Sequence, residues 1–254
     1  MRIGGEMYPI LFTIGKLSVY THGLMMAVGG LFGGLAIFYM AKKQHLRTDF
    51  ILDICVYALL AGLFGSRILY IILYFNEFSS FEEMLYIWHG GLVSYGGIAG
   101  GLLVSLLILK IKKEPVLKWF DIGIIGLMVG WAFGRVGCFL NGDSYGLWSI
   151  SKLSIWGRIP TQLFESIWSL IASFLLFYFG LKIKEQKKLP DGIIFFGGLG
   201  LYSIGRFVID FWRDEPVTVW FLKTGQIGSA LVLIFAVLSI SYLFGKERKP
   251  NGSN

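Results

Sequence analysis

Apolar residues along this chain are gathered into seven long runs, and short polar segments separate them. A helix rises about 1.5 Å per residue, so each run has about the length that crosses a hydrocarbon layer of about 30 Å. The pattern predicts an all-α integral membrane protein, a single domain over residues 1–254 with seven transmembrane helices. The predicted helices lie near residues 17–40, 50–75, 90–109, 119–140, 162–181, 192–211 and 227–245.

Basic residues are concentrated in alternate connections between these runs. Four segments on one predicted side hold 14 of the 23 Lys and Arg residues, namely Lys42, Lys43, Arg47, Lys110, Lys112, Lys113, Lys118, Lys182, Lys184, Lys187, Lys188, Lys246, Arg248 and Lys249. The connection 76–89, on the other side, holds Glu77, Glu82 and Glu83 and no Lys or Arg. Positively charged loops stay in the cytoplasm. We therefore expect an external N-terminus and a cytoplasmic C-terminus.

The longest connection on the predicted outer side covers residues 141–161, between helices four and five. It contains Trp148 and Trp156, and tryptophan favours the headgroup level of a bilayer. We predict a small external cap here; a plain connecting loop with aromatic anchors is the alternative.

Composition supports a membrane protein, because 55% of the residues are hydrophobic and only 15% are charged. Soluble domains carry about 25% charged residues. The net charge of +7 does not indicate nucleic-acid binding, since the basic residues sit in short clusters rather than on one folded face. Cys55 and Cys138 each lie in or beside an apolar run, and no residues have metal-ligand spacing. We predict no disulfide, no metal and no cofactor.

Charged side chains inside predicted spans are costly and usually mark a function. The candidates are Arg67, Arg135, Glu165, Arg206 and Asp210. With the predicted orientation, all five lie in the outer halves of their helices. His22 and Tyr95 lie near the outer starts of helices one and three. These residues are therefore expected at one depth, beneath the external leaflet.

Two of these arginines could have a purely structural role instead of binding a ligand. Arg206 and Asp210 are four residues apart, the spacing of a helical salt bridge, and Arg67 could extend toward the interface or pair with a neighbour. Arg135 lies in the glycine-rich segment 134–146, where backbone can approach a ligand. Guanidinium groups bind phosphate oxygens in a two-pronged geometry. The simplest ligand at this depth is the headgroup of an anionic phospholipid.

The segment 134–146 resembles the signature G-R-x-G-N-F-x-N-x-E-x-x-G of the bacterial prolipoprotein diacylglyceryl transferases. Further blocks match in the same order, at residues 23–25, 65–67, 90–97, 158–166, 202–210 and 225–226. The resemblance covers nearly the whole chain. It implies a protein of the bacterial cytoplasmic (inner) membrane with seven spans, an external N-terminus and an active site toward the outer leaflet.

The resemblance also implies a reaction. Members of the family transfer the diacylglyceryl group of phosphatidylglycerol to the lipobox cysteine of an exported prolipoprotein, forming a thioether and releasing glycerol phosphate. The implied partners are phosphatidylglycerol, the signal peptide with its lipobox, and the bilayer, without nucleic acid. Carried over by position, Arg135 would hold the headgroup phosphate. Arg206 would stabilise the departing glycerol phosphate or orient the thiol. The other substrate-site residues implied are Asn141, Asp143, Gly146, Arg67, Tyr202, Asp210, Gln162 and Glu165.

The sequence departs from the family pattern at four positions. Cys138 replaces the signature's first Asn, and Asp143 replaces its Glu. Tyr95 stands where many members have His, whereas His22 stands where Tyr is frequent. We hypothesise that His22 assists removal of the thiol proton; alternatively it is a satisfied polar residue and the arginines suffice. Tyr95 could hydrogen-bond a substrate, although a phenol is a poor base at neutral pH. Cys138 is interpreted as a packing residue.

Two other functions remain alternatives from the residues alone. A transporter or flippase for an anionic lipid or solute would also carry arginines inside a helix bundle, but it predicts access from both faces. A metal-dependent lipid transferase would show an aspartate motif such as D-G-x-x-A-R, which the sequence lacks.

Overall fold

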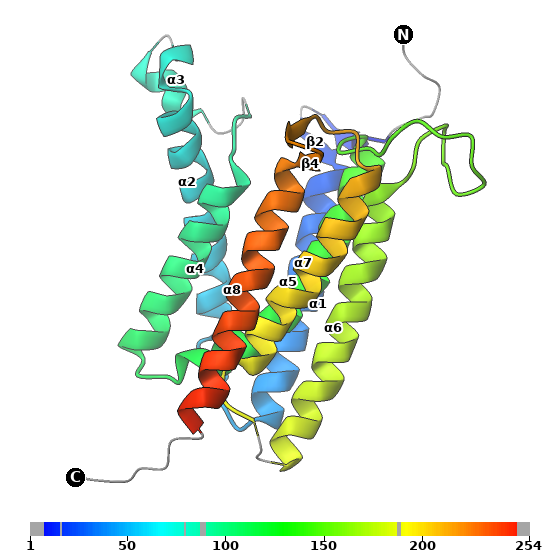
Figure 1. Ribbon diagram of the computed structural model, residues 1–254. Coiled ribbons are helices and arrows are strands. Elements are labelled where there is room, and N and C mark those ends of the chain that lie inside the picture. Colours follow the sequence, from blue (N-terminus) through cyan, green and yellow to red (C-terminus); the bar gives the residue numbers. More distant parts are fainter. Residues whose placement is uncertain (1–7, 16, 79, 87–89, 187–188, 248–254) are drawn as a thin grey trace. The chain divides into compact units, whose positions relative to one another are not determined.

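The computed structural model describes residues 8–15, 17–78, 80–86, 90–186 and 189–247, and these are mainly helical (Figure 1). The elements in chain order are β1 (Ile10–Ile14), β2 (Leu17–Tyr20), α1 (Thr21–Lys43), α2 (Ile51–Leu73), η1 (Phe75–Glu77), α3 (Phe81–Leu85), α4 (Ser94–Ile111), α5 (Val116–Asn141), α6 (Thr161–Gln186), α7 (Ile193–Ile209), η3 (Asp210–Trp212), β3 (Val217–Val219), β4 (Leu222–Lys223) and α8 (Thr224–Glu247). The strands form two antiparallel hairpins, β1–β2 and β3–β4.

The chain divides into two compact units. The smaller unit is Arg47–Trp119 and contains α2 and α4, which pack together. The close approach of these two helices depends on glycine, because a Cβ at Gly96 would overlap the carbonyl oxygen of Gly65. The larger unit is Met1–Leu46 with Phe120–Asn254, and its described part is a bundle of α1, α5, α6, α7 and α8.

The larger unit has two chemically different ends. Both strand hairpins and the connection between α5 and α6 lie at one end of the bundle, the upper end in Figure 1, which we call the hairpin end. Lys42 and Lys43 close α1 and Lys246 closes α8, both at the opposite end. Within this unit the lysines that end α1 and α8 therefore lie away from the hairpins.

Helices α1 and α5 approach each other through small residues. Gly33 lies against the backbone of Gly126, and Gly29 lies against Gly130 one turn away. Without side chains on these faces the two backbones come into contact, which is how transmembrane helices commonly associate.

A buried carboxylate on α5 caps the N-terminus of α7. Asp121 on α5 accepts hydrogen bonds from the backbone N–H groups of Gly192 and Phe195, both at 2.8 Å. A carboxylate is stabilised at a helix N-terminus, where unpaired N–H groups and the helix dipole face it. Asp121 thus joins α5 to α7 at the end of the bundle opposite the hairpins.

The connection between α5 and α6 has a defined structure. Backbone hydrogen bonds run from Ser149 to Gly157 and in both directions between Ile155 and Arg158. The Arg158 guanidinium lies 4.7 Å from the Trp148 ring and pairs with Asp214 at 2.7 Å. These contacts distinguish the segment from a plain linker.

Six described helices are long and apolar enough to cross a bilayer, consistent with an integral membrane protein. They are α1, α2, α5, α6, α7 with η3, and α8. The apolar part of α4, Tyr95–Ile111, is shorter and would extend for about 26 Å. Leu17–Tyr20, expected at the start of the first helix, forms β2 instead, because these residues pair with β1.

Two adjacent glycines of α1 provide a test of the helix crossing. A Cβ at Gly33 would lie 2.5 Å from the Gly126 carbonyl oxygen, whereas a Cβ at Gly34 would have no atom within 4 Å. We expect Gly33→Ala to lower the free energy of unfolding by about 1–3 kcal/mol through overpacking. Gly34→Ala should leave it nearly unchanged. Thermal unfolding of both purified variants in detergent measures the difference; equal stability would contradict the observed crossing.

Candidate functional site

The carboxylate of Glu165, near the start of α6, is surrounded by three arginines. Arg135 Nε lies 2.5 Å from Glu165 Oε2, and Arg206 Nη1 donates to Oε1 at 2.6 Å. Arg213 also pairs with Oε1. Arg135 Nε makes no hydrogen bond to the described part of the chain, so its link to Glu165 is an ion pair alone. One carboxylate thereby joins α5, α7 and the segment after η3 to α6.

A second buried carboxylate, Asp210, extends this network. Arg213 Nε donates to its Oδ1 at 2.9 Å, and Arg206 Nε lies 3.1 Å from its Oδ2. Gly225 permits this arrangement, since a Cβ there would overlap Asp210 Oδ2. The half-exposed Glu215 approaches Arg206 and Arg213 at 3.9 and 3.7 Å. Three arginines thus face three acids.

The buried amine of Lys223 holds the turn that carries Arg213. Its Nζ donates to three backbone carbonyl oxygens, those of Asp210 at 2.7 Å, Phe211 at 3.2 Å and Arg213 at 2.5 Å. Burial lowers the pKa of Arg213 to about 10, and repulsion from Arg135 acts in the same direction. At neutral pH Arg213 therefore still carries the charge that Glu165 and Asp210 require.

Exposure separates the three arginines. The Arg213 side chain is 2% exposed, whereas Arg135 and Arg206 are 12% and 15% exposed. Arg135 also lies 4.9 Å from the Trp131 ring, which packs edge-on against Tyr202. The side chains of Arg135 and Arg206 are therefore partly accessible, whereas Arg213 is enclosed by its ion-pair partners.

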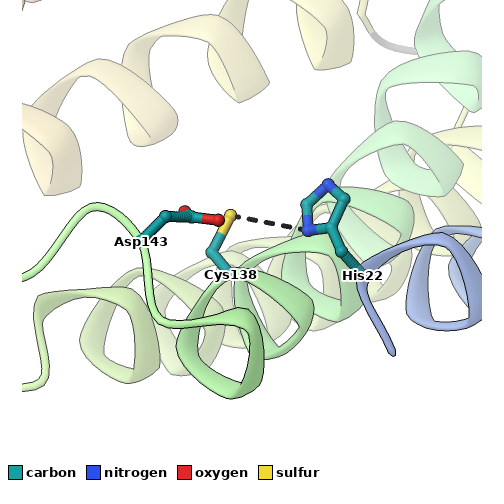
Figure 2. Close-up of side chains that lie close together, drawn as sticks. All are labelled: His22, Cys138 and Asp143. Carbon is teal, nitrogen blue, oxygen red and sulfur yellow. Dashed lines mark hydrogen bonds between the residues drawn. The ribbon is translucent and has the colours of Figure 1, made fainter. Parts of the chain in front are cut away.

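A thiol, an imidazole and a carboxylate meet beside Arg135 (Figure 2). Cys138 Sγ lies 3.9 Å from His22 Nδ1, and Arg135 Nη1 contacts the same sulfur at 3.8 Å. Asp143 completes the group, in which the three possible ligand atoms lie within 4.8 Å of one another. All three residues are half-buried.

Three predicted residues shape the loop that carries Asp143. Asn141 Nδ2 donates to Asp143 Oδ2 at 2.9 Å, and the buried Gln162 donates from Nε2 to the Asp143 carbonyl oxygen at 2.6 Å. Gly146 lies where two chain segments cross, and a Cβ there would overlap the Ile159 carbonyl oxygen. These contacts set the position of Asp143 relative to α5 and α6.

Two predicted site residues belong to the smaller unit. Arg67 is buried and donates to the backbone oxygens of Glu83, Met84, Gly90 and Gly91 at 2.6–3.0 Å. These bonds hold the connection between α2 and α4, as expected for an arginine that pairs with nearby groups. Tyr95 lies in the first turn of α4 and is 71% exposed. The structure brings together the other ten predicted residues, all of them in the larger unit.

Sequence reasoning did not assign Arg213, Glu215 and Lys223 to the site. Arg213 had a visible signal, because it follows Asp210 by three residues and can share its helical face. Glu215 and Lys223 lie in the connection before α8, where no helical periodicity relates them to the arginines.

Comparison with known proteins identifies the family. Residues 9–242 match the family described as prolipoprotein diacylglyceryl transferase. A phosphatidylglycerol–prolipoprotein diacylglyceryl transferase of Clostridium botulinum (strain Langeland) is 30% identical, and the alignment covers 96% of this chain and 100% of that protein. A protein of the same name from Nostoc sp. is 27% identical over 94% of this chain and 90% of its own. The chain therefore belongs to the prolipoprotein diacylglyceryl transferase family.

Proposed function

We propose that this protein transfers the diacylglyceryl group of phosphatidylglycerol to the lipobox cysteine of exported prolipoproteins. The thiolate sulfur attacks the glyceryl carbon that bears the phosphate ester. A C–S bond forms, the C–O bond breaks, and the oxygen leaves with the electron pair as glycerol phosphate. The observation that carries this proposal is the pair of accessible arginines, Arg135 and Arg206, held by buried Glu165 at the hairpin end of the bundle.

The arginines suit the phosphate of this lipid. Glu165 pairs with both arginines and Asp210 pairs with Arg206, and the two arginine side chains stay 12% and 15% exposed. Donors aimed at developing charge stabilise a transition state most when they need no reorganisation. We assign Arg135 to the headgroup phosphate and Arg206 to the departing glycerol phosphate or the orientation of the thiol.

The remaining predicted residues would support these two arginines. Tyr202 and Asp210 would hold their positions, while Glu165, whose oxygens face arginines, would act by positioning them. The described contacts of Asn141, Asp143, Gly146 and Gln162 suit residues that shape the lipid site. Arg67 and Tyr95 remain proposed substrate-binding residues on the sequence resemblance alone.

The substrate thiol must lose its proton before it attacks, since the thiolate is the nucleophile. We propose that His22 assists this loss. Its imidazole lies in the larger unit with the arginines, next to the Cys138 sulfur that Arg135 contacts. Tyr95 would instead hydrogen-bond a substrate.

We place the protein in the bacterial cytoplasmic membrane with seven spans, which are the six long apolar helices and the shorter α4. The N-terminus would be external and the C-terminus cytoplasmic. The lysine-rich end of the larger unit supports this orientation, since cytoplasmic ends are basic. The site and the structured α5–α6 connection would then face the outer leaflet, the connection forming an external cap. Both substrates reach that side. A transporter would instead require access from both ends.

The transfer reaction itself tests the proposal. Purified protein is mixed with phosphatidylglycerol and a lipobox peptide, and the thioether product is measured. We expect Arg135→Ala and Arg206→Ala each to lower the rate by at least about 10²–10³-fold, the usual effect of removing a transition-state donor. The control is Arg47→Ala, whose native side chain is 55% exposed and lies outside the site. Unchanged rates in both site variants would contradict the proposal.

Removing the charge of Glu165 tests its positioning role. Glu165→Gln leaves the three arginines, of which Arg213 is fully buried, with one acid fewer, so we expect a loss of about 3–5 kcal/mol in unfolding free energy. Asp214→Asn is the control, because Asp214 is half-exposed in its pair with Arg158, and such pairs contribute about 1 kcal/mol or less. Thermal unfolding in detergent compares the two. A Glu165→Gln protein as stable as the control would be evidence against a network centred on this carboxylate.

Orientation is tested by labelling introduced cysteines. Ser151→Cys in the α5–α6 connection should react with a membrane-impermeant maleimide in intact cells. Lys43→Cys, at the lysine-rich end, should react only after permeabilisation. The wild-type chain, with half-buried Cys55 and Cys138, provides the background. Reaction of Lys43→Cys in intact cells, with Ser151→Cys protected, would reverse the proposed orientation.

A further inference from the structure

Three of the four positions at which the sequence departs from the family pattern meet in space. His22 comes from the start of α1, Cys138 from the end of α5, and Asp143 from the connection after α5 (Figure 2). Phenol, amide and longer carboxylate are replaced by imidazole, thiol and shorter carboxylate. The replacements therefore form one set of nitrogen, sulfur and oxygen donors.

The geometry of this set is close to that of a tetrahedral metal centre. Zinc binds sulfur at about 2.3 Å and imidazole nitrogen at about 2.0–2.1 Å, which puts the two ligand atoms about 3.6 Å apart. Cys138 Sγ and His22 Nδ1 are 3.9 Å apart, and the carboxylate oxygen of Asp143 lies within 4.8 Å of both. Changes of a few tenths of an ångström to about 1 Å would bring all three onto one ion.

The surroundings hold these ligands in position. Asn141 donates to Asp143 Oδ2 and thereby orients the carboxylate, as residues behind metal ligands commonly do. The imidazole lies against Gly137, where a Cβ would be 3.1 Å from His22 Nδ1. Arg135 contacts the Cys138 sulfur at 3.8 Å, and Glu165 offsets the arginine charge. A thiol that coordinates a metal ion is deprotonated by it. The thiolate and the Asp143 carboxylate together would balance a divalent cation.

We propose that His22, Cys138 and Asp143 bind a zinc-class divalent ion, whose fourth position accepts the substrate thiol. This inference rests on the proposed transfer reaction and deepens it. Catalytic zinc sites typically have three protein ligands and one open position. A thiol bound there loses its proton to water, and the metal holds the resulting thiolate. His22 then assists deprotonation as a ligand.

The binding test uses cobalt as a spectroscopic probe of the full chain in detergent. Protein stripped with a chelator is titrated with Co²⁺. We expect one Co²⁺ per chain and a thiolate-to-cobalt charge-transfer band in the near ultraviolet. Cys138→Ser should abolish the band, and Asn141→Ala should weaken binding by about 10- to 100-fold. The control Cys55→Ser, on α2 of the smaller unit, should retain the band.

The result that overturns the site is a wild-type chain without this band, or a band that persists in Cys138→Ser. Cys138→Asn restores the signature residue and guards against a folding defect. It should unfold at the wild-type temperature when metal is absent and still fail to bind Co²⁺.

The substrate thiol is tested on the cobalt protein. A lipobox peptide should intensify the charge-transfer band, because a second thiolate joins the ion, whereas the same peptide with serine at the lipobox position should not. A band unchanged by both peptides overturns the assignment of the fourth position.

Activity measurements separate this inference from the proposed function. If stripped protein transfers diacylglyceryl at the full rate, the catalytic metal is wrong and the proposed function stands. If the cobalt protein responds to the cysteine peptide but makes no thioether, the ligand set stands and the proposed function fails.

Discussion

The ion pairs of Glu165 are the interaction on which the rest of the larger unit depends. A carboxylate that is 3% exposed is stable only when charged partners compensate for lost water. The partners come from α5, α7 and the segment after η3, so the compensation requires those elements to converge on α6. The converse also holds, because the buried Arg213 needs Glu165 and Asp210. The packing of the bundle and the geometry of the site therefore depend on the same ion pairs.

The acids in this network neutralise the charge of the arginines that we propose to bind phosphate. Three arginines ion-paired with three acids leave no formal excess of positive charge among themselves. Attraction by net charge is then a small part of binding. The larger part is preorganisation, since ordering long side chains on binding otherwise costs free energy. In the proposed site, Arg135 and Arg206 would be ordered before the lipid arrives, and their planar forks would match phosphate oxygens.

Hydropathy predicted most of the helices, but it did not predict the structure at their ends. Long apolar runs predicted the helices because length and composition suffice for a span. The residues before α1 form β2, since pairing with β1 outweighed an apolar pattern that suits either state. Asp121 lay within a predicted span without an assigned role, because its partners, the N–H groups of Gly192 and Phe195, are over 70 residues away.

Sequence analysis predicted the site residues that lie within apolar helices, and it missed those that lie in the polar connection before α8. Arg135, Glu165 and Arg206 are anomalous in apolar runs, so their cost made them visible. Lys223 and Glu215 stand in a polar connection, where charge is ordinary and only folding relates them to the arginines. Glu165 is predicted as a substrate-site residue, and in the structure both of its oxygens face arginines, which offset the cost of burying its charge.

The exchanged positions of imidazole and phenol have a physical consequence. Tyr95 lies in the smaller unit and is 71% exposed, whereas His22 is in the larger unit with every ion pair of the Glu165 network. With the imidazole on α1, the groups that we propose to act on phosphate and on thiol share one set of packed helices. The distance from His22 Nδ1 through Cys138 Sγ to Arg135 is set by α1 and α5, whose backbones touch through glycine. In the proposed reaction, the α1–α5 crossing therefore sets the spacing between the imidazole that would act on the thiol and the arginine that would bind the phosphate.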